Sequence, residues 1–172
     1  MKYLIKNQKF KTMANISSNT LSIKGSYEEV DEVLSFIASV DEEGGSTPFD
    51  FNKVIPMPDD IDKGPGDCET NLSNPKYWTN WCTANWGTKW NACDAELKAH
   101  GLITFNTAWA PPIPVIRELS KRFPKVVFSI EYWTENDVTR YDVEDYQDGY
   151  LTQEITKWDV DLIKELEKEN AL

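Results

Sequence analysis

The chain has 172 residues, of which 40% are hydrophobic and 27% charged, as in one ordinary globular domain. It contains no run of 18 apolar residues, so a membrane-spanning helix is excluded. One histidine and three cysteines without a Cys-x-x-Cys pair do not supply a paired set of zinc ligands, and we predict neither a metal site nor a cofactor. No apolar stretch follows the charged N-terminus, so we expect a cytoplasmic protein.

The formal net charge of −11 is spread unevenly along the chain. Acidic blocks at 27–69 and 131–172 flank a mildly basic middle, whereas residues 1–26 carry five lysines and no acid. Contacts to nucleic-acid phosphates require a basic footprint, so this charge argues against general nucleic-acid binding. It favours a protein partner with a basic surface, through complementary potentials. The alternative explanation is that the acidity only keeps the protein soluble.

In chain order, an N-terminal segment (1–18) is followed by a predicted strand at 19–25 and an amphipathic helix that ends near Val40. Ser26 with Glu29 three residues later forms the pattern of a capping box at the start of this helix. Apolar residues then recur at helical spacing, at Val30, Val33, Leu34 and Ile37.

Alternating apolar residues at 49–55 predict a second strand, which prolines end. A loop-rich insertion follows at 56–74, with aspartates at 59, 60, 62 and 67. These aspartates lack the order of an EF-hand loop, so we interpret the segment as a solvated loop and not as a calcium site. A helix is then predicted from Pro75, after Asn74 as its cap, to about Ala84.

The second half of the chain is predicted to be mainly strands. Strong strand patterns lie at 101–109 and 126–133, and an amphipathic helix from Pro114 to Phe123 separates them. Weaker elements complete the chain: a short strand or turn at 94–97, strands at 139–143 and 149–156 with a turn at 147–149, and a terminal helix at 159–172. With helices on one face of a largely antiparallel sheet, we predict a single α+β domain over 19–172 with a ferredoxin-like split βαβ core.

Three ordered motifs, at 85–92, 105–112 and 119–124, resemble the YubB ferredoxin-like family of plasmid and phage proteins. They read Asn-Trp-Gly-Thr-Lys-Trp-Asn-Ala, Phe-x-Thr-Ala-Trp-x-Pro-Pro and Leu-Ser-x-x-Phe-Pro. The resemblance covers roughly residues 50–155 and implies a ferredoxin-like fold, without an iron–sulfur cluster, in a protein of mobile genetic elements. It implies no established reaction, so fold and setting transfer and function does not.

The first of these motifs contains a candidate recognition loop, formed by Trp86, Thr88, Lys89 and Trp90. Tryptophan faces stack on bases or other ligands, and the lysine would contact a phosphate. The alternative, which we favour, is that the tryptophans fill the core because a domain must bury its aromatic side chains.

The sequence contains no convincing catalytic constellation, and we expect a protein that is not an enzyme. His100 has no nucleophile in a motif beside it. Glu131 with Asp142 or Glu144 would form a carboxylate pair on neighbouring strands, as in glycosidases, but acidic strands often look this way.

The preferred hypothesis is a small, non-enzymatic phage or plasmid accessory protein that binds a host protein and blunts a defence system, of the anti-restriction or anti-CRISPR type. Its acidic residues would imitate the charge of DNA, at a surface formed by Asp137, Asp142, Glu144, Asp145 and Asp148 and by acids at 41–62. The alternatives are a nucleic-acid-binding module that uses the Trp-rich basic centre, and an enzyme that acts on a small substrate.

Overall fold

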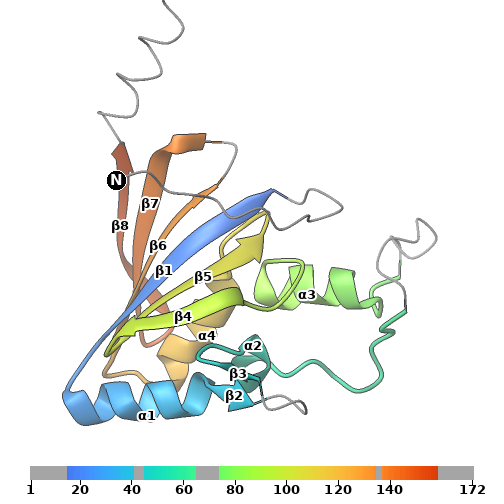
Figure 1. Cartoon of the computed structure of the whole chain (residues 1–172), viewed down its shortest axis with the longest axis horizontal. Coiled ribbons are helices and arrows are strands. Elements are labelled where there is room, and N and C mark those ends of the chain that lie inside the picture. Colours follow the sequence, from blue (N-terminus) through green and yellow to red (C-terminus); the bar gives the residue numbers. More distant parts are fainter. Residues whose placement is uncertain (1–14, 41–44, 65–73, 135–136, 159–172) are drawn as a thin grey trace, which may run out of the picture.

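The computed structural model describes residues 15–40, 45–64, 74–134 and 137–158, and its centre is a six-stranded sheet (Figure 1). In sheet order the strands are β4 (Cys93–Ala99), β5 (Leu102–Ala108), β1 (Ile16–Lys24), β6 (Val127–Thr134), β7 (Asp137–Gln147) and β8 (Tyr150–Trp158). The described helices are α1 (Tyr27–Ile37), α2 (Phe51–Val54), α3 (Trp78–Trp86) and α4 (Ile113–Arg122). A separate ribbon pairs β2 (Ser39–Val40) with β3 (Ser46–Thr47).

The order β4-β5-β1-β6, with α1 after β1 and α4 after β5, is the split βαβ arrangement of a ferredoxin-like fold. All neighbouring strands are antiparallel, so β1 and β4 run in the same direction with β5 between them. The elements β2, β3, α2 and α3 are inserted between α1 and β4, while β7 and β8 extend the sheet beyond β6. The predicted α+β fold, with a largely antiparallel sheet and helices on one face, is confirmed.

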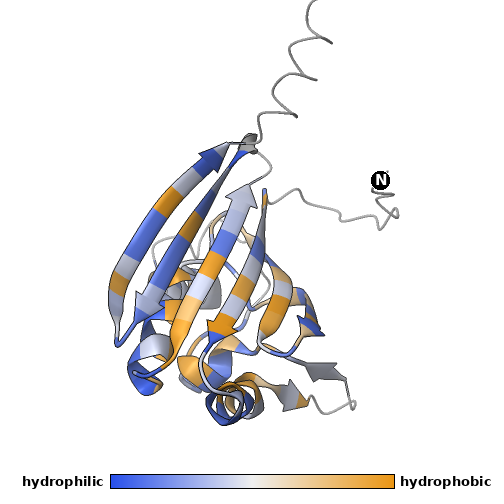
Figure 2. Ribbon diagram, turned by 90° about the vertical axis from the view of Figure 1, so that its left-hand side faces the viewer, coloured by the Kyte–Doolittle hydropathy of each residue, from blue (hydrophilic) through white to orange (hydrophobic). Residues whose placement is uncertain are grey.

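The helices cover one face of the sheet because its strands alternate in polarity (Figure 2). On β1, Leu21 and Ile23 are buried toward the helices. They pack with residues of β5, β6, α1 and α4 that include Ile103, Phe128, Val33, Ile116 and Leu119. Each of these buried side chains contributes about 1.5–3 kcal/mol through the hydrophobic effect. None of the described helices lies on the other face of the sheet (Figure 2).

The capping box of α1 is present as predicted. The backbone N–H of Glu29 donates to Ser26 Oγ at 3.3 Å, and the backbone N–H of Ser26 donates to the Glu29 carboxylate at 2.9 Å. The helix ends at Ile37 and not near Val40, because the next residues leave the helix and form β2. The predicted helix from Pro114 to Phe123 is confirmed as α4.

The predicted strand at 49–55 is wrong, since this segment forms the short helix α2. Asp50 caps the helix by accepting a hydrogen bond from the backbone N–H of Asn52. Asn91 accepts a 2.8 Å bond from the N–H of Phe51 and donates a 2.7 Å bond to Asp50. The alternation was misleading because Phe49 and Phe51 are both buried without being in a strand.

The other predicted elements exist with shifted boundaries. The helix predicted from Pro75 begins at Trp78, the strand or turn at 94–97 is the longer β4, and residues 16–18 belong to β1. The turn between β7 and β8 lies at Asp148 and Gly149, whose φ angles are 50° and 82°, as in the tight turn of a hairpin. The predicted terminal helix at 159–172 and residues 65–73 of the predicted insertion lie outside the described residues. No described helix is both long and apolar enough to cross a membrane.

Candidate functional site

The face of the sheet that none of the described helices covers contains a hollow of about 310 Å³, which we call the sheet-face hollow. It lies over β4, β5, β1 and β6, the four strands of the ferredoxin-like core. Its lining is mostly polar and consists of Ser18, Asn19, Thr20, Asp94, Glu96, Lys98, Thr104, Phe105, Asn106, Glu131 and Trp133.

Strand register brings these residues together from distant parts of the chain. Thr20 stands opposite Thr104 on β5 and opposite Glu131 on β6, and Thr104 in turn stands opposite Glu96 on β4. Directly opposed residues of an antiparallel pair point to the same face. The four side chains therefore form one row across the hollow, with a carboxylate at each end.

A second row carries Asn106, Ser18 and Trp133, which are also opposed across β5, β1 and β6. Ser18 Oγ donates to the Asn106 side-chain oxygen at 3.2 Å, and Asn106 Nδ2 donates to Asp94 at 3.3 Å. The register of β4 shifts between Cys93 and Glu96, and Asp94 there has a positive φ of 50°. A bulge of this kind re-aims a side chain, and here it directs a third carboxylate to the hollow.

The hollow is electrostatically negative because three carboxylates face one ammonium group. Lys98 forms an ion pair with Glu96. Among the described residues, the Glu131 carboxylate has no ion-pair partner. Trp133 is 41% exposed beside these charges. Within the described part of the chain, no three His, Cys, Asp or Glu side chains converge closely enough to hold a metal ion. The arrangement is suited to cationic side chains, which pair with carboxylates and stack on an indole ring.

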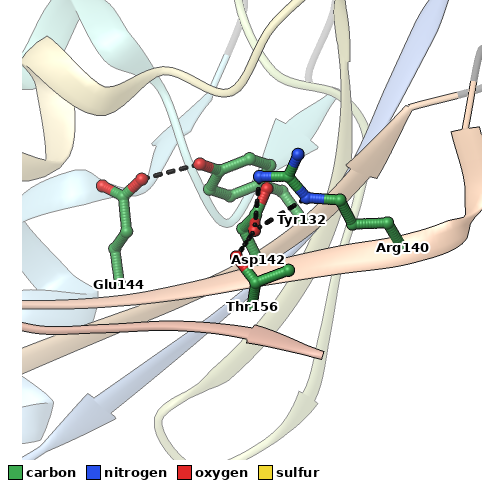
Figure 3. Close-up of polar contacts among 5 residues, drawn as sticks. All are labelled: Tyr132, Arg140, Asp142, Glu144 and Thr156. Atoms are coloured by element: carbon green, nitrogen blue, oxygen red, sulfur yellow. Dashed lines mark hydrogen bonds and ion pairs between the residues drawn. The ribbon is translucent and has the colours of Figure 1, made fainter. Parts of the chain in front are cut away.

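A second polar cluster lies on β6, β7 and β8, beside the core (Figure 3). Tyr132 donates a 2.6 Å hydrogen bond to Glu144, and Tyr146 donates to the other oxygen of the same carboxylate. Burial, reinforced by Glu144, raises the pKa of Tyr146 to about 12 and also raises the pKa of Tyr132. Both hydroxyls therefore stay protonated and keep donating at neutral pH.

The neighbouring carboxylate of this cluster is also occupied. Asp142 accepts a 3.0 Å bond from Arg140 and a 2.6 Å bond from Thr156 (Figure 3). Both oxygens of Glu144 and Oδ1 of Asp142 accept hydrogen bonds from fixed partners, so the cluster ties β6, β7 and β8 together.

The acidic surface predicted over β7 is divided by the alternation of the strand. Asp142 and Glu144 lie on the covered face, and only 9% of Glu144 is exposed. Asp145 points to the opposite face, where it pairs with Lys24 at 3.6 Å. Asp148 is exposed in the hairpin turn, and Asp137 is the first residue of β7. Asp142, Glu144 and Asp145 therefore do not share one open face.

The carboxylate pair considered for catalysis is not formed, because Glu131 lies on the face opposite to Asp142 and Glu144. Glu131 stands opposite Val143 on β7 and points to the same face as Val143. Asp142 and Glu144, the two neighbours of Val143, point to the other face.

The candidate recognition loop is divided between core and surface. Trp86 is 2% exposed and donates to the carbonyl of Ile55, and Thr88 is 1% exposed and bonds the backbone of Ala108. Trp90 is partly buried. Lys89 lies 5.3 Å from the ring centroid of Trp109, which is 49% exposed. Trp86 therefore packs in the core, and Thr88 fixes the backbone of Ala108.

The sequence interpretation missed Asp94, Glu96 and Trp133 as site residues. The available signal was the alternation of β1, in which every second residue is small and polar. These outward-facing residues are Ser18, Thr20 and Ser22. Identifying their neighbours required the strand order.

Residues 85–172, about half of the chain, match the model of a family described as the ferredoxin-like domain in Api92-like protein. No curated protein matches the chain. Among solved structures, the protein Api92 from Yersinia pseudotuberculosis is similar, with 17% sequence identity and a TM-score of 0.47. That match covers 63% of this chain but 39% of the Api92 chain, so this chain spans well under half of the length of Api92. By the family match, the chain belongs to the ferredoxin-like domains of Api92-like proteins.

Proposed function

We propose that this protein is a non-enzymatic binding protein that docks a partner with a basic surface on the uncovered face of its sheet. The observation that carries the proposal is the sheet-face hollow, in which Asp94, Glu96 and Glu131 face Lys98 as the one ammonium group among the described lining residues and flank the exposed Trp133. Cationic side chains of a partner would pair with these carboxylates and steer its approach.

The contacts of the candidate catalytic side chains favour a binding protein over an enzyme. His100 stacks on Tyr27 with ring centroids 4.1 Å apart, and its Nε2 lies 3.1 Å from Asp31. Glu144 is held by two tyrosine hydroxyls beside the core. These contacts hold the side chains against their neighbours, which favours a structural role over a catalytic one.

The finer part of the proposal concerns the setting. The resemblance to the YubB family suggests a protein of plasmids or phages that acts in the host cytoplasm, and a DNA-like negative charge suggests a nucleic-acid-binding defence protein as its target. Carboxylates on an open sheet face would then compete with phosphates for the basic groove of that target.

The first experiment measures binding of a fluorescein-labelled octa-arginine peptide by anisotropy at low salt. The hollow variant D94N/E96Q/E131Q is compared with a matched variant, E28Q/D148N/E154Q, which removes the same number of charges elsewhere. We expect at least a tenfold weaker affinity for the hollow variant and a change below threefold for the control. Equal losses in the two variants would show that only net charge matters, and would refute a docking site in the hollow.

The second experiment identifies the partner in host-cell lysate. The protein and both variants are used as baits, with nuclease treatment and with washes at low and high salt. A protein that the parent and the control variant retain after nuclease treatment, and that the hollow variant loses, would be the expected target.

A second candidate function, nucleic-acid binding, has one specific observation in its favour. Lys89 and the exposed Trp109 lie together at the end of β5, as in a site for a stacked base and its phosphate. It predicts salt-dependent quenching of tryptophan fluorescence by single-stranded DNA that W109A abolishes and the hollow variant retains.

A further inference from the structure

We infer that the lysine-rich segment 1–14 of the same chain occupies the sheet-face hollow when no partner is bound, and so regulates partner binding. The inference rests on the proposed function, because it requires that the hollow accept cationic side chains. It adds an internal competitor to the site.

The first argument is position. The described chain begins at Asn15, whose carbonyl accepts a 2.7 Å hydrogen bond from the backbone N–H of Trp109. The next residue, Ile16, opens β1 opposite Ala108, and Ser18 already lines the hollow. Segment 1–14 is therefore joined to the sheet at the end of the hollow that Ser18 and Trp133 form.

The second argument is charge complementarity. Segment 1–14 contains Lys2, Lys6, Lys9 and Lys11 and no Asp or Glu. It is the complement of a hollow in which carboxylates outnumber ammonium groups three to one. Trp133, at 41% exposure, offers a ring face on which an ammonium group gains a cation–π interaction.

The third argument is reach. A strand rises about 3.3 Å per residue, so Thr20 in the hollow lies about 17 Å along β1 from Asn15. A chain of 14 residues spans at most about 50 Å when fully extended. The segment is long enough to turn back and cover the row from Glu131 to Glu96. Tethering at this distance gives effective concentrations in the millimolar range, which favours the internal lysines over a dilute partner.

A second copy of the chain fits the hollow less well. Each copy carries a formal charge of −11, so two copies repel each other, whereas the tethered segment carries only positive charge. Segment 1–14 is also covalently joined to the hollow, so it is present beside every hollow at any protein concentration. For these reasons the structure points to an intramolecular occupant.

The consequence is a measurable loss of apparent affinity. If segment 1–14 fills the hollow in nine molecules of ten, an external cationic ligand binds about tenfold more weakly than to a free hollow. Removing the positive charges of segment 1–14 should therefore increase the affinity for an external cationic ligand by about tenfold.

The first test is carbodiimide cross-linking of the full chain at low salt, read by mass spectrometry. We expect cross-links within one chain from lysines of segment 1–14 to Asp94, Glu96 or Glu131, which disappear at high salt. A variant with all four lysines changed to arginine keeps the charge but has no lysine amine in segment 1–14, so it should lose these lysine cross-links. Cross-links found only between two chains, or none, would overturn the inference.

The second test uses the octa-arginine peptide and the full chain with Lys2, Lys6, Lys9 and Lys11 changed to glutamine. We expect this variant to bind the peptide about tenfold more tightly than the parent, and the arginine variant to bind like the parent. An unchanged affinity in the glutamine variant overturns the inference while the proposed function stands. If changing Asp94, Glu96 and Glu131 leaves the affinity for the octa-arginine peptide unchanged, the proposed function itself is refuted.

Discussion

Tyr132 on β6 donates a 2.6 Å hydrogen bond to Glu144 on β7, while the residue before it, Glu131, faces the sheet-face hollow. Two adjacent residues of one strand thus serve different purposes. Tyr132 belongs to a closed network on the covered side of the sheet, and Glu131 leaves its charge on the uncovered side. The period of the strand separates a stabilising acid–tyrosine contact from a carboxylate available to a ligand.

Changing Tyr132 to phenylalanine should destabilise the fold. The substitution leaves Glu144, of which 9% is exposed, with one hydroxyl donor in place of two. Removing one partner of a hydrogen bond to a buried charged group costs about 1–3 kcal/mol. Urea denaturation of Y132F measures the loss. The control is Y150F, because Tyr150 is 72% exposed and its change should stay within about 0.5 kcal/mol. Equal stabilities of the two variants would contradict the role of the network.

The same network should make the protein sensitive to alkaline pH. Burial and the contact with Glu144 raise the pKa of Tyr146 to about 12, whereas an unfolded tyrosine titrates near 10. Because the folded pKa is the higher one, the contribution to the free energy of unfolding is fully present below pH 10 and is lost between pH 10 and about 12. Urea midpoints at pH 8 and pH 11 test this. We expect a smaller decrease for Y146F than for the parent, and a decrease in Y150F equal to that of the parent.

The start of α1 was fully predictable because its signal is local. Ser26 and Glu29 are three residues apart, and a capping box needs only those two side chains and the backbone between them. The segment at 49–55 failed for the opposite reason. Its helical turn is fixed by Asn91, which is 40 residues from Phe51 and makes no pattern with it in the sequence.

The candidate site was even less accessible to sequence reasoning. The hydrogen bond between Ser18 and Asn106 joins residues 88 apart, and it exists only because β1 pairs with β5. The acidic run of β7 drew the prediction because its charges are adjacent in the chain. Adjacent residues of a strand point to opposite faces, so acids that are neighbours in the sequence lie on different sides of the sheet. The residues of the hollow are far apart in the sequence and are brought together by the register of the strands.

The capping box gives a third prediction. Replacing Ser26 with alanine removes the acceptor for the backbone N–H of Glu29 and should cost about 1 kcal/mol. Ser35 is exposed in the last turn of the same helix, and S35A should be neutral or slightly stabilising because alanine is the better helix former. Thermal unfolding of the two variants checks the difference, and a loss in S35A as large as that in S26A would contradict it.

Gly87 should not tolerate a side chain. Its φ angle is 80°, and a Cβ atom there would lie 2.8 Å from Cδ of Pro114, in a ring that does not move aside. We expect Gly87→Ala to cost about 1–3 kcal/mol, from left-handed backbone strain and from displacement of α4. Gly64 is the matched control, since its nearest neighbour is the side-chain oxygen of Asp62 at 3.1 Å and its φ is not in the left-handed region. A G87A protein as stable as G64A would show that α3 and α4 are not held together at this point.

The carboxylates of the hollow should behave in the opposite way to Glu144 when they are neutralised. Asp94, Glu96 and Glu131 are exposed, and they concentrate negative charge in a chain that is already acidic. Their mutual repulsion opposes folding, so D94N/E96Q/E131Q should unfold at the same temperature as the parent or a few degrees higher. Replacing an acidic residue that supports the fold lowers the stability of the protein, whereas replacing one that serves only binding does not. Differential scanning calorimetry at low salt decides between the two, and a lower unfolding temperature would place these three residues among the supports of the sheet and not at a binding surface.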